Sequence, residues 1–240
     1  MASELYVSLS GQMVMETRLA TVANNVANMR TAGFRAETVN FDTVLSDYRA
    51  DRVNFAAVGD MHIERMAGPI EATGNPLDVA IVGDAWFGIE TPSGLAYTRD
   101  GRFTVSPEGD LKTLTGYGVA DEGGAPIQLD PAGGPLIIGG DGSMMQNGRQ
   151  VGVLGRFTLP ESANLTRYGD TALLSDVAGE PAVDRMANGV RQGYREGSNV
   201  NPIQAITELI EIQRAFDNAT SAVGDREETL QRAVRTLGAT

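Results

Sequence analysis

The sequence predicts an α+β protein in which long N- and C-terminal helices pair as a coiled-coil-like core around an inserted, mainly antiparallel β domain. Glycine is absent from residues 34–58 and 198–223 but recurs every few residues between Gly59 and Gly155. Frequent glycine among short apolar runs marks turns between strands, whereas its absence permits long helices. Apolar residues also recur at helical spacing near both ends of the chain.

These patterns divide the chain into three parts. Residues 1–36 and 198–240 are expected to form a discontinuous helical core. Residues 37–72 are expected to be a linker or extended segment, and residues 73–197 a β-rich domain. The two ends of the chain would therefore fold as one unit, with the β-rich part inserted between them.

The N-terminal helix is predicted from about Ser3, a suitable N-cap, to about Met29. Gly33 lies where a left-handed residue could end it. The helix carries one apolar stripe made of Leu5, Leu19, Val22, Val26 and Met29, and a slimmer stripe made of Met13, Ala20, Ala23 and Ala27.

Three asparagines, Asn24, Asn25 and Asn28, lie within this helix although asparagine is a poor helix former. We expect their amides to hydrogen-bond across tightly packed helices and so to fix register. The alternative is that Asn28 helps to end the helix and that the other two are exposed.

The C-terminal helix has the clearest local signals. Asn201 is a good N-cap, Pro202 suits the first helical position, and Gln204 can complete a capping box. One heptad position is apolar throughout, with Leu209, Phe216, Val223, Leu230 and Leu237. Its companion position is mixed, with Ile206, Gln213, Thr220, Glu227 and Val234. Two such helices could pair and leave surface for further partners, although a simple antiparallel pair within a monomer is the alternative.

The middle of the chain is predicted to be a meander of β-hairpins. Leu77, Val79 and Ile81 alternate with polar or small residues as in a half-buried strand. The sequences TPSG and SPEGD are proline and glycine turns of the kind that join antiparallel strands.

Composition excludes several classes of function. The net charge of −12 opposes binding to nucleic acid or to anionic membrane surfaces. No apolar run is long enough to cross a bilayer. The N-terminus lacks the basic start and the unbroken apolar run of a secretory signal, so we expect no cleaved signal peptide.

No catalytic, cofactor-binding or metal-binding residues are predicted, and we expect no enzyme activity. Cysteine is absent and His62 is the only histidine, which removes thiolate chemistry and the common zinc sites. Carboxylates are plentiful, but no spacing specifies a facing pair. Trp86 and Phe87 could form a sugar-stacking face, which keeps a secreted carbohydrate-binding β protein as a remote alternative.

Three segments, in order, resemble motifs of the bacterial flagellar rod and hook proteins. ANNVANMRTAGFRA at residues 23–36 is similar to the N-terminal motif of that family. Residues 73–119, which contain TGNPLD, GDAWF and YTRDGRF, resemble its β-domain run. EGSNVNPIQAITELIEIQRAF, beginning at Glu196, resembles its C-terminal segment. Ala85 and Trp86 depart from the usual Gly-Phe of the second motif.

The resemblance implies a non-enzymatic structural subunit of the flagellar rod, without a cofactor. The short stretch at residues 37–72 is most like the proximal-rod members, with distal-rod or hook members as the alternative. In the family the terminal helices polymerise as an inner tube, the assembly core, and the β domain lies outside it. The tube is a periplasm-spanning drive shaft that carries motor torque to the hook and filament.

The implied partners are copies of the chain, other rod subunits of the basal body and, in transit, the flagellar type III export apparatus. Neither nucleic acid nor membrane insertion is expected. The residues expected to form the helix seams and register of the assembly are Leu5, Leu19, Val22, Asn24, Asn25, Val26, Asn28, Gly33, Phe34, Ile206, Leu209, Phe216, Val223, Leu230, Val234 and Leu237.

Overall fold

The computed structural model describes the backbone of residues 2–48, 51–184 and 187–237, and side chains within residues 9–40, 59–184 and 187–221. The chain divides into two compact units. Unit 1 comprises Met1–Ala27, Glu37–His62 and Asn201–Thr240, and unit 2 comprises Asn28–Ala36 and Ile63–Val200.

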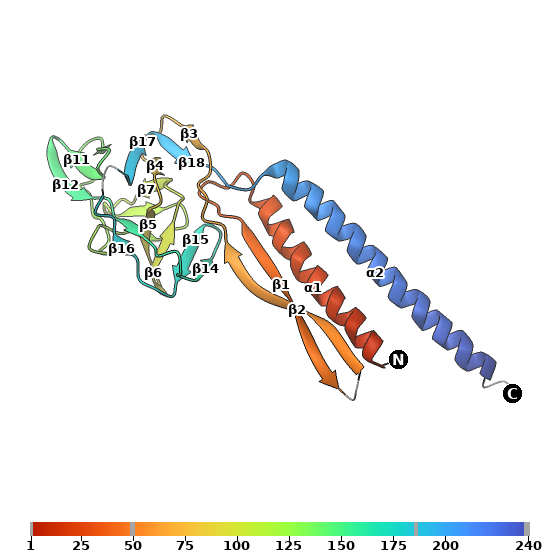
Figure 1. Cartoon of the computed structure of the whole chain (residues 1–240). Coiled ribbons are helices and arrows are strands. Elements are labelled where there is room, and N and C mark those ends of the chain that lie inside the picture. Colours follow the sequence, from red (N-terminus) through yellow and green to blue (C-terminus); the bar gives the residue numbers. More distant parts are fainter. Residues whose placement is uncertain (1, 49–50, 185–186, 238–240) are drawn as a thin grey trace. The chain divides into compact units, whose positions relative to one another are not determined.

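Unit 1 contains both helices of the described chain and one long hairpin. Helix α1 spans Ala2–Ala27 and helix α2 spans Pro202–Leu237. Strands β1 (Glu37–Tyr48) and β2 (Asp51–Ile63) form a two-stranded sheet. Helix α1 contacts both α2 and β1 (Figure 1). One helix is therefore packed between a second helix and a long hairpin.

The start of α2 follows the predicted capping chemistry. The backbone N–H groups of Ile203 and Gln204 donate to Oδ1 of Asn201 at 3.1 and 3.3 Å. Pro202 occupies the first helical position, where a missing N–H costs nothing. The predicted N-cap is confirmed.

The predicted coiled-coil-like core is wrong, although the class α+β is confirmed. A coiled coil buries its two apolar heptad positions against a partner helix. On the described part of α2, Ala205 and Ile212 are buried, whereas Leu209 and Phe216 of the predicted seam are only half-buried. The predicted companion position is exposed at Ile206, Gln213 and Thr220. The β1–β2 hairpin also packs on α1, so helix pairing is not the whole of unit 1.

Unit 2 consists of short antiparallel strands. The largest sheet has nine strands, with β14, β15, β6, β5, β9, β8 and β7 in order and with β13 pairing β5 and β16. Its strands are β5 (Trp86–Thr91), β6 (Gly94–Thr98), β7 (Phe103–Val105), β8 (Leu111–Thr113), β9 (Gly118–Val119), β13 (Arg156–Thr158), β14 (Leu165–Tyr168), β15 (Ala172–Ser175) and β16 (Glu180–Pro181).

Three smaller sheets complete unit 2. One contains β10 (Ile137–Ile138), β11 (Ser143–Gln146) and β12 (Arg149–Val153), and the two others pair β4 (Val79–Val82) with β17 (Gly189–Gln192) and β3 (Ile70–Ala72) with β18 (Tyr194–Glu196). The pairs β3–β18 and β4–β17 join the first strands of unit 2 to its last strands. Unit 2 is therefore closed by segments that lie more than a hundred residues apart in the chain.

The predicted turns join the strands as expected. At TPSG the Thr91 hydroxyl donates to the Gly94 carbonyl at 2.7 Å, and this turn connects β5 to β6. At SPEGD, Gly109 has a φ of 96° and its N–H donates to the Ser106 carbonyl, between β7 and β8. The predicted antiparallel hairpins are confirmed, but a simple meander is wrong, because β15 pairs with β6 and β9 with β5 across the sequence.

The core of unit 2 is closely packed and apolar. Phe87 and Phe103 meet edge to face with ring centroids 5.2 Å apart. They belong to a cluster of buried side chains that includes Val79, Ile81, Leu111, Val119, Ile127, Leu129, Leu136, Ile138, Met144, Leu154 and Val190. This core gives unit 2 an internal source of stability.

Candidate functional site

The predicted N-terminal stripe is only partly buried within unit 1. Val22 is buried, whereas Leu19 and Val26 are half-buried. The other side chains of α1 that are buried, in its described part, are Val14, Thr21 and Asn25. The buried face of α1 therefore includes polar residues that apolar spacing did not select.

Asn25 joins α1 to the start of β1. Its Nδ2 donates to the backbone oxygen of Glu37 at 2.8 Å, and its Oδ1 accepts from the backbone nitrogen of Glu37 at 2.9 Å. The amide thus satisfies both backbone groups of one residue, as a neighbouring strand would. Asn25 fixes the position of β1 on α1 within one chain.

The other two asparagines also have neighbours in the chain. Asn24 Nδ2 reaches Oε2 of Glu37 at 3.4 Å. Asn28 Oδ1 accepts from the Thr31 hydroxyl at 2.9 Å, just after α1 ends. A role of these three amides in the register between subunits stays a prediction.

Gly33 and Phe34 belong to unit 2 rather than to the helices. Gly33 has a φ of 68°, and a Cβ atom there would lie 2.1 Å from the backbone nitrogen of Asp100. Phe34 is fully buried, with the Arg167 guanidinium 4.3 Å from its ring centroid. Both residues fix the segment 28–36 inside unit 2, and their part in assembly stays a prediction.

Five predicted assembly residues lie outside the described side chains: Leu5, Val223, Leu230, Val234 and Leu237. The backbone at these positions is helical, in α1 for the first and in α2 for the others. Their part in a seam stays a prediction.

Helix α1 has an exposed face of apolar and small residues. Leu9 is 49% exposed and Met13 is 60% exposed. Ala20, Ala23 and Ala27 continue the same face at helical spacing and are also exposed. We call Met13, Ala20, Ala23 and Ala27 the alanine stripe; it is the slimmer stripe that the sequence analysis identified. Small side chains let another backbone approach closely.

Helix α2 has an exposed apolar face at its N-terminal end. Ile203, Ile206 and Ile210 are 79%, 41% and 45% exposed. These residues, which we call the isoleucine stripe, lie three and four positions apart and so share one face. Of these three residues, only Ile206 lies at a predicted heptad position. The signal that would have found the stripe is the spacing of isoleucines within IQAITELI.

A hollow of about 300 Å³ lies in unit 1 beside Asn25. Its wall includes Val22, Glu37 and the ion pair of Arg18 with Glu208, which measures 2.7 Å. The two ion-pair side chains are 42% and 44% exposed, so water screens this contact. The hollow is open and polar, and it is lined by the elements that meet at α1.

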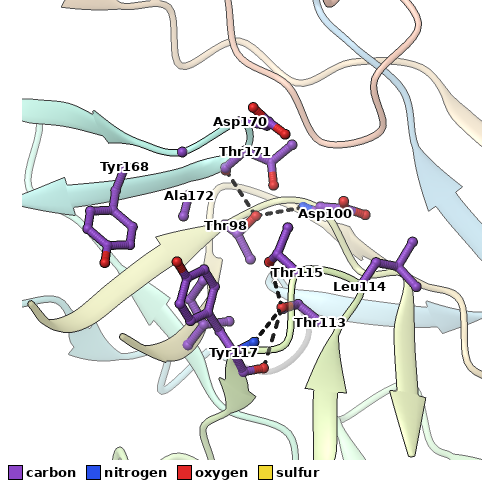
Figure 2. Close-up of a pocket in the computed structure, with 12 residues that line it drawn as sticks. Thr98, Asp100, Thr113, Leu114, Thr115, Tyr117, Tyr168, Asp170, Thr171 and Ala172 are labelled. Carbon is purple, nitrogen blue, oxygen red and sulfur yellow. Dashed lines mark hydrogen bonds between the residues drawn. The ribbon is translucent and has the colours of Figure 1, made fainter. Parts of the chain in front are cut away.

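A smaller hollow lies on unit 2 and is shown in Figure 2. Its volume is about 120 Å³, well below the roughly 300–1,000 Å³ of most ligand sites. The Thr98 hydroxyl donates to the Thr171 carbonyl and accepts from the Asp100 N–H, both at 3.0 Å. A side-chain hydrogen bond with Tyr168 raises the pKa of Tyr117. The polar groups of Thr98 and Asp100 that line this hollow are thus already bonded within the protein.

The described structure offers no sugar-stacking face at the aromatic pair that the sequence suggested. Trp86 is 3% exposed and Phe87 is fully buried. Among the described residues, no three histidine or carboxylate side chains are grouped closely enough to hold a metal ion. Within the same part of the chain, neither helix combines the length and apolar character that a membrane span requires.

The helices of unit 1 expose apolar faces that are suited to association, as in a protein that assembles with others. Three family models match the sequence of the chain. They are flagella basal body rod protein over residues 5–35, flagellar hook protein FlgE/F/G D1 domain over residues 80–146, and flagellar basal body rod FlgEFG protein C-terminal over residues 191–236. Together with the relatives below, they show that the chain belongs to the family of flagellar basal-body rod proteins.

Within this family the similarity favours FlgF. The chain is 47% identical to the flagellar basal-body rod protein FlgF of Rhizobium meliloti (strain 1021) and 44% identical to that of Mesorhizobium japonicum, over 99% of each chain. It is 30% identical to the flagellar basal-body rod protein FlgG of Bacillus subtilis (strain 168), over 98% of each chain. The chain is thus a structural rod protein of the flagellar basal body and not an enzyme.

Proposed function

We propose that this chain is a subunit of the proximal part of the flagellar rod, which carries motor torque to the hook and filament. The support is the similarity to FlgF proteins along 99% of both chains. In this proposal the subunit polymerises through unit 1, with copies of itself and with adjacent rod subunits. A distal-rod function is the second candidate, supported by the more distant likeness to FlgG proteins.

Two exposed helix faces, the isoleucine stripe of α2 and the alanine stripe of α1, support assembly through unit 1. The isoleucine stripe exposes three large aliphatic side chains, of which Ile203 is 79% exposed. Burying one such side chain contributes about 1.5–3 kcal/mol. The alanine stripe offers a slim face against which another helix can pack closely. Association removes both apolar faces from water, which favours a polymer over the free subunit.

The predicted seam residues enter the same proposal. Leu209 and Phe216 are half-buried within one chain, so each has surface left to contact a neighbour. Asn24 and Asn25 would set register between helices of neighbouring subunits in addition to their bonds to Glu37 within the chain. Replacing both asparagines by alanine is the test. Normal rod assembly and motility in this double variant would reject the register role.

The location and the export route of the subunit are proposed by analogy with the family. The rod is part of the basal body, and we propose that this subunit occupies its periplasmic section. We also propose that it leaves the cytoplasm through the flagellar type III export apparatus without cleavage of a signal peptide. A density map of intact basal bodies with the chain traced in it distinguishes a proximal position from one beneath the hook.

The assembly surface is tested by adding charge to the isoleucine stripe. The double variant Ile203→Asp and Ile206→Glu places two carboxylates near the α2 N-terminus, where the helix dipole favours them. The isolated subunit should therefore keep its helix content, measured by circular dichroism. In cells that contain only this variant, we expect no rod in isolated basal bodies and no swimming, because the charges would be buried on assembly.

Gln204→Asp is the matched control. It adds a carboxylate to an exposed position of the same helix turn, about 100° away from Ile203. This variant should assemble and swim. Normal rods built from the double variant would contradict assembly through the isoleucine stripe.

A further inference from the structure

Unit 2 contains a buried cluster of three charged side chains that come from distant parts of the chain. Arg35, Arg99 and Glu196 are 1%, 2% and 1% exposed. Arg35 Nη2 donates to Oε1 of Glu196, and Arg99 Nη1 donates to Oε2 at 3.1 Å. The carboxylate therefore joins the segment after α1 to the end of strand β6 and to the segment before α2.

The two guanidinium groups are held in place by aromatic and backbone contacts. Both lie over the Trp86 ring, at 5.4 Å for Arg35 and 5.2 Å for Arg99. Arg99 also donates to the Gly83 carbonyl at 2.6 Å. Burial lowers the pKa of Arg99 to about 10, while Glu196 opposes this shift. With this pKa Arg99 is charged at neutral pH, and the Glu196 carboxylate pairs with both guanidinium groups.

Glu196 also binds a third segment of the chain. Its Oε1 accepts from the backbone N–H of Gly68 at 2.9 Å. The carboxylate thus contacts residues of segments 28–36 and 63–69 from its own position in segment 196–200. These are the three segments through which the chain enters and leaves unit 2.

Asn199 repeats this arrangement three residues further on. Its Oδ1 accepts from the backbone N–H of Ala36 at 2.7 Å. Its Nδ2 donates to the carbonyls of Glu64 and Met66 at 3.2 and 3.0 Å. One amide therefore binds both of the other segments, as Glu196 does.

Backbone hydrogen bonds connect the same three segments directly. Gly33 N–H donates to the Glu196 carbonyl, and Gly197 N–H donates to the Pro69 carbonyl, both at 2.8 Å. Glu64 N–H donates to the Ala36 carbonyl, also at 2.8 Å. Every pair of segments is therefore bonded at least once.

We propose that Glu196 and Asn199 form a clasp that makes these three segments of unit 2 open and close as one. A force applied to one of the three segments is then distributed over its bonds to the other two. No segment can separate from unit 2 by itself. The role of the clasp as a joint that withstands torque rests on the proposed rod function. The coupling of the segments does not rest on it.

The clasp is tested first by hydrogen exchange on the purified full chain. Glu196→Gln removes the charge that holds Arg35 and Arg99, and we expect exchange at the Gly68 amide to rise about tenfold or more. A clasp predicts a rise of similar size at the Ala36 amide, which is bonded to Asn199 and not to Glu196. An unchanged Ala36 amide would overturn the coupling.

Arg195→Gln is the matched control, since it removes the adjacent charge. Arg195 pairs with Glu71 at 3.0 Å, but these side chains are 42% and 52% exposed. Exchange at Gly68 and Ala36 should stay at the level of the unchanged chain. An equal rise in this control would overturn the specific role of Glu196.

Asn199→Ala supplies the reciprocal measurement if Glu196→Gln does not fold. It removes the bonds to Ala36, Glu64 and Met66 without leaving a buried charge. The clasp predicts faster exchange at Gly68 as well as at Ala36, and an unchanged Gly68 would overturn it.

The mechanical role is tested in swimming cells. In media of rising viscosity, cells with Asn199→Ala should lose motility at a lower load than cells with Arg195→Gln. If each variant assembles into rods and both kinds of cell lose motility at the same viscosity, the clasp has no role in withstanding torque. If the unchanged chain were absent from basal bodies, the proposed function would fail, while the exchange result would still stand.

Discussion

Units 1 and 2 differ in where their large apolar residues lie. Unit 2 has an enclosed apolar core, in which Phe87 and Ile81 are 0% and 2% exposed, beside scattered exposed residues such as Val183. In unit 1 the side chains of Ile203 and Met13 are 79% and 60% exposed although they lie on helices. Unit 2 therefore has a core of its own to stabilise it, whereas the described part of unit 1 keeps apolar surface on its helices that association would bury. A substitution should affect folding in one unit and association in the other.

Charged groups show a related contrast between the buried cluster of unit 2 and exposed ion pairs, which occur in both units. In unit 2 Glu196 is buried between two arginines, whereas the Arg18–Glu208 pair of unit 1 is about half-exposed. Removing one member of a buried cluster leaves an unpaired charge, whereas removing one member of an exposed pair leaves a solvated one. Measurements of stability should therefore respond far more strongly to changes in the buried cluster than to changes in an exposed pair.

The largest expected effect is that of Phe87→Ala in the core of unit 2. Loss of a fully buried ring that contacts Phe103 should lower the free energy of unfolding by about 3–5 kcal/mol. Urea titration followed by the fluorescence of Trp86, the only tryptophan, reports on this unit. Phe216→Ala in α2 is the control, and it should leave this transition unchanged. Equal losses would refute the contrast.

Gly33→Ala should be the next most damaging change. An alanine there must adopt a φ of 68° and would bring Cβ to 2.1 Å from the Asp100 backbone. Strain and overpacking together should reduce the stability of unit 2 by about 2–5 kcal/mol.

Gly11→Ala is the opposite case, in unit 1. Gly11 lies within α1 and has no atom within 4 Å of a Cβ placed on it. Alanine should stabilise the helix by about 0.5–1 kcal/mol, seen as increased helix content or a higher melting temperature. A loss of helix content would contradict the open surface at this position.

A moderate effect is expected from Asn25→Ala in unit 1. The change removes two hydrogen bonds to Glu37, and we expect a loss of about 1–3 kcal/mol in local stability. Hydrogen exchange at the Glu37 amide measures it. Asn218→Ala, at an exposed position of α2, should leave that amide unchanged. Unchanged exchange in Asn25→Ala would show that β1 is held on α1 by other contacts.

The smallest effect is expected for the ion pair between Arg18 and Glu208. A double-mutant cycle with alanine at both positions should give a coupling energy of about 0.2–1 kcal/mol that declines as salt is added. A coupling energy above about 2 kcal/mol would place this pair in the same class as the buried cluster of unit 2.

The sequence predicted those features that depend on neighbouring residues. The N-cap at Asn201 and the turns at TPSG and SPEGD follow from side chains that bond to the backbone close by. The apolar run at Val79 and Ile81 likewise forms a strand, but the predicted half-buried alternation is wrong, because Ala80 between them is also buried. Local chemistry is sufficient for such elements.

Features that depend on the choice of partner were not predictable in the same way. The heptad pattern identified a repeat on α2 but not which face turns inward, because Ala205 and Ile212 repeat at the same interval as Leu209 and Phe216. The pairing of β1 with β2 was also not anticipated. Arg35, Arg99 and Glu196 all lie in segments that resemble the family, yet no local rule indicates that they meet.

The position of Glu196 has a consequence for the order in which the chain can fold. Arg35 and Arg99 lie 161 and 97 residues before the carboxylate that neutralises them. As the chain is synthesised from its N-terminus, both arginines stay hydrated until that late residue arrives, and loop closure over such distances is slow. Unit 2 can therefore finish folding only after strand β18, which ends at Glu196, has been made. A chain that stops before this strand lacks the carboxylate that pairs with the two arginines.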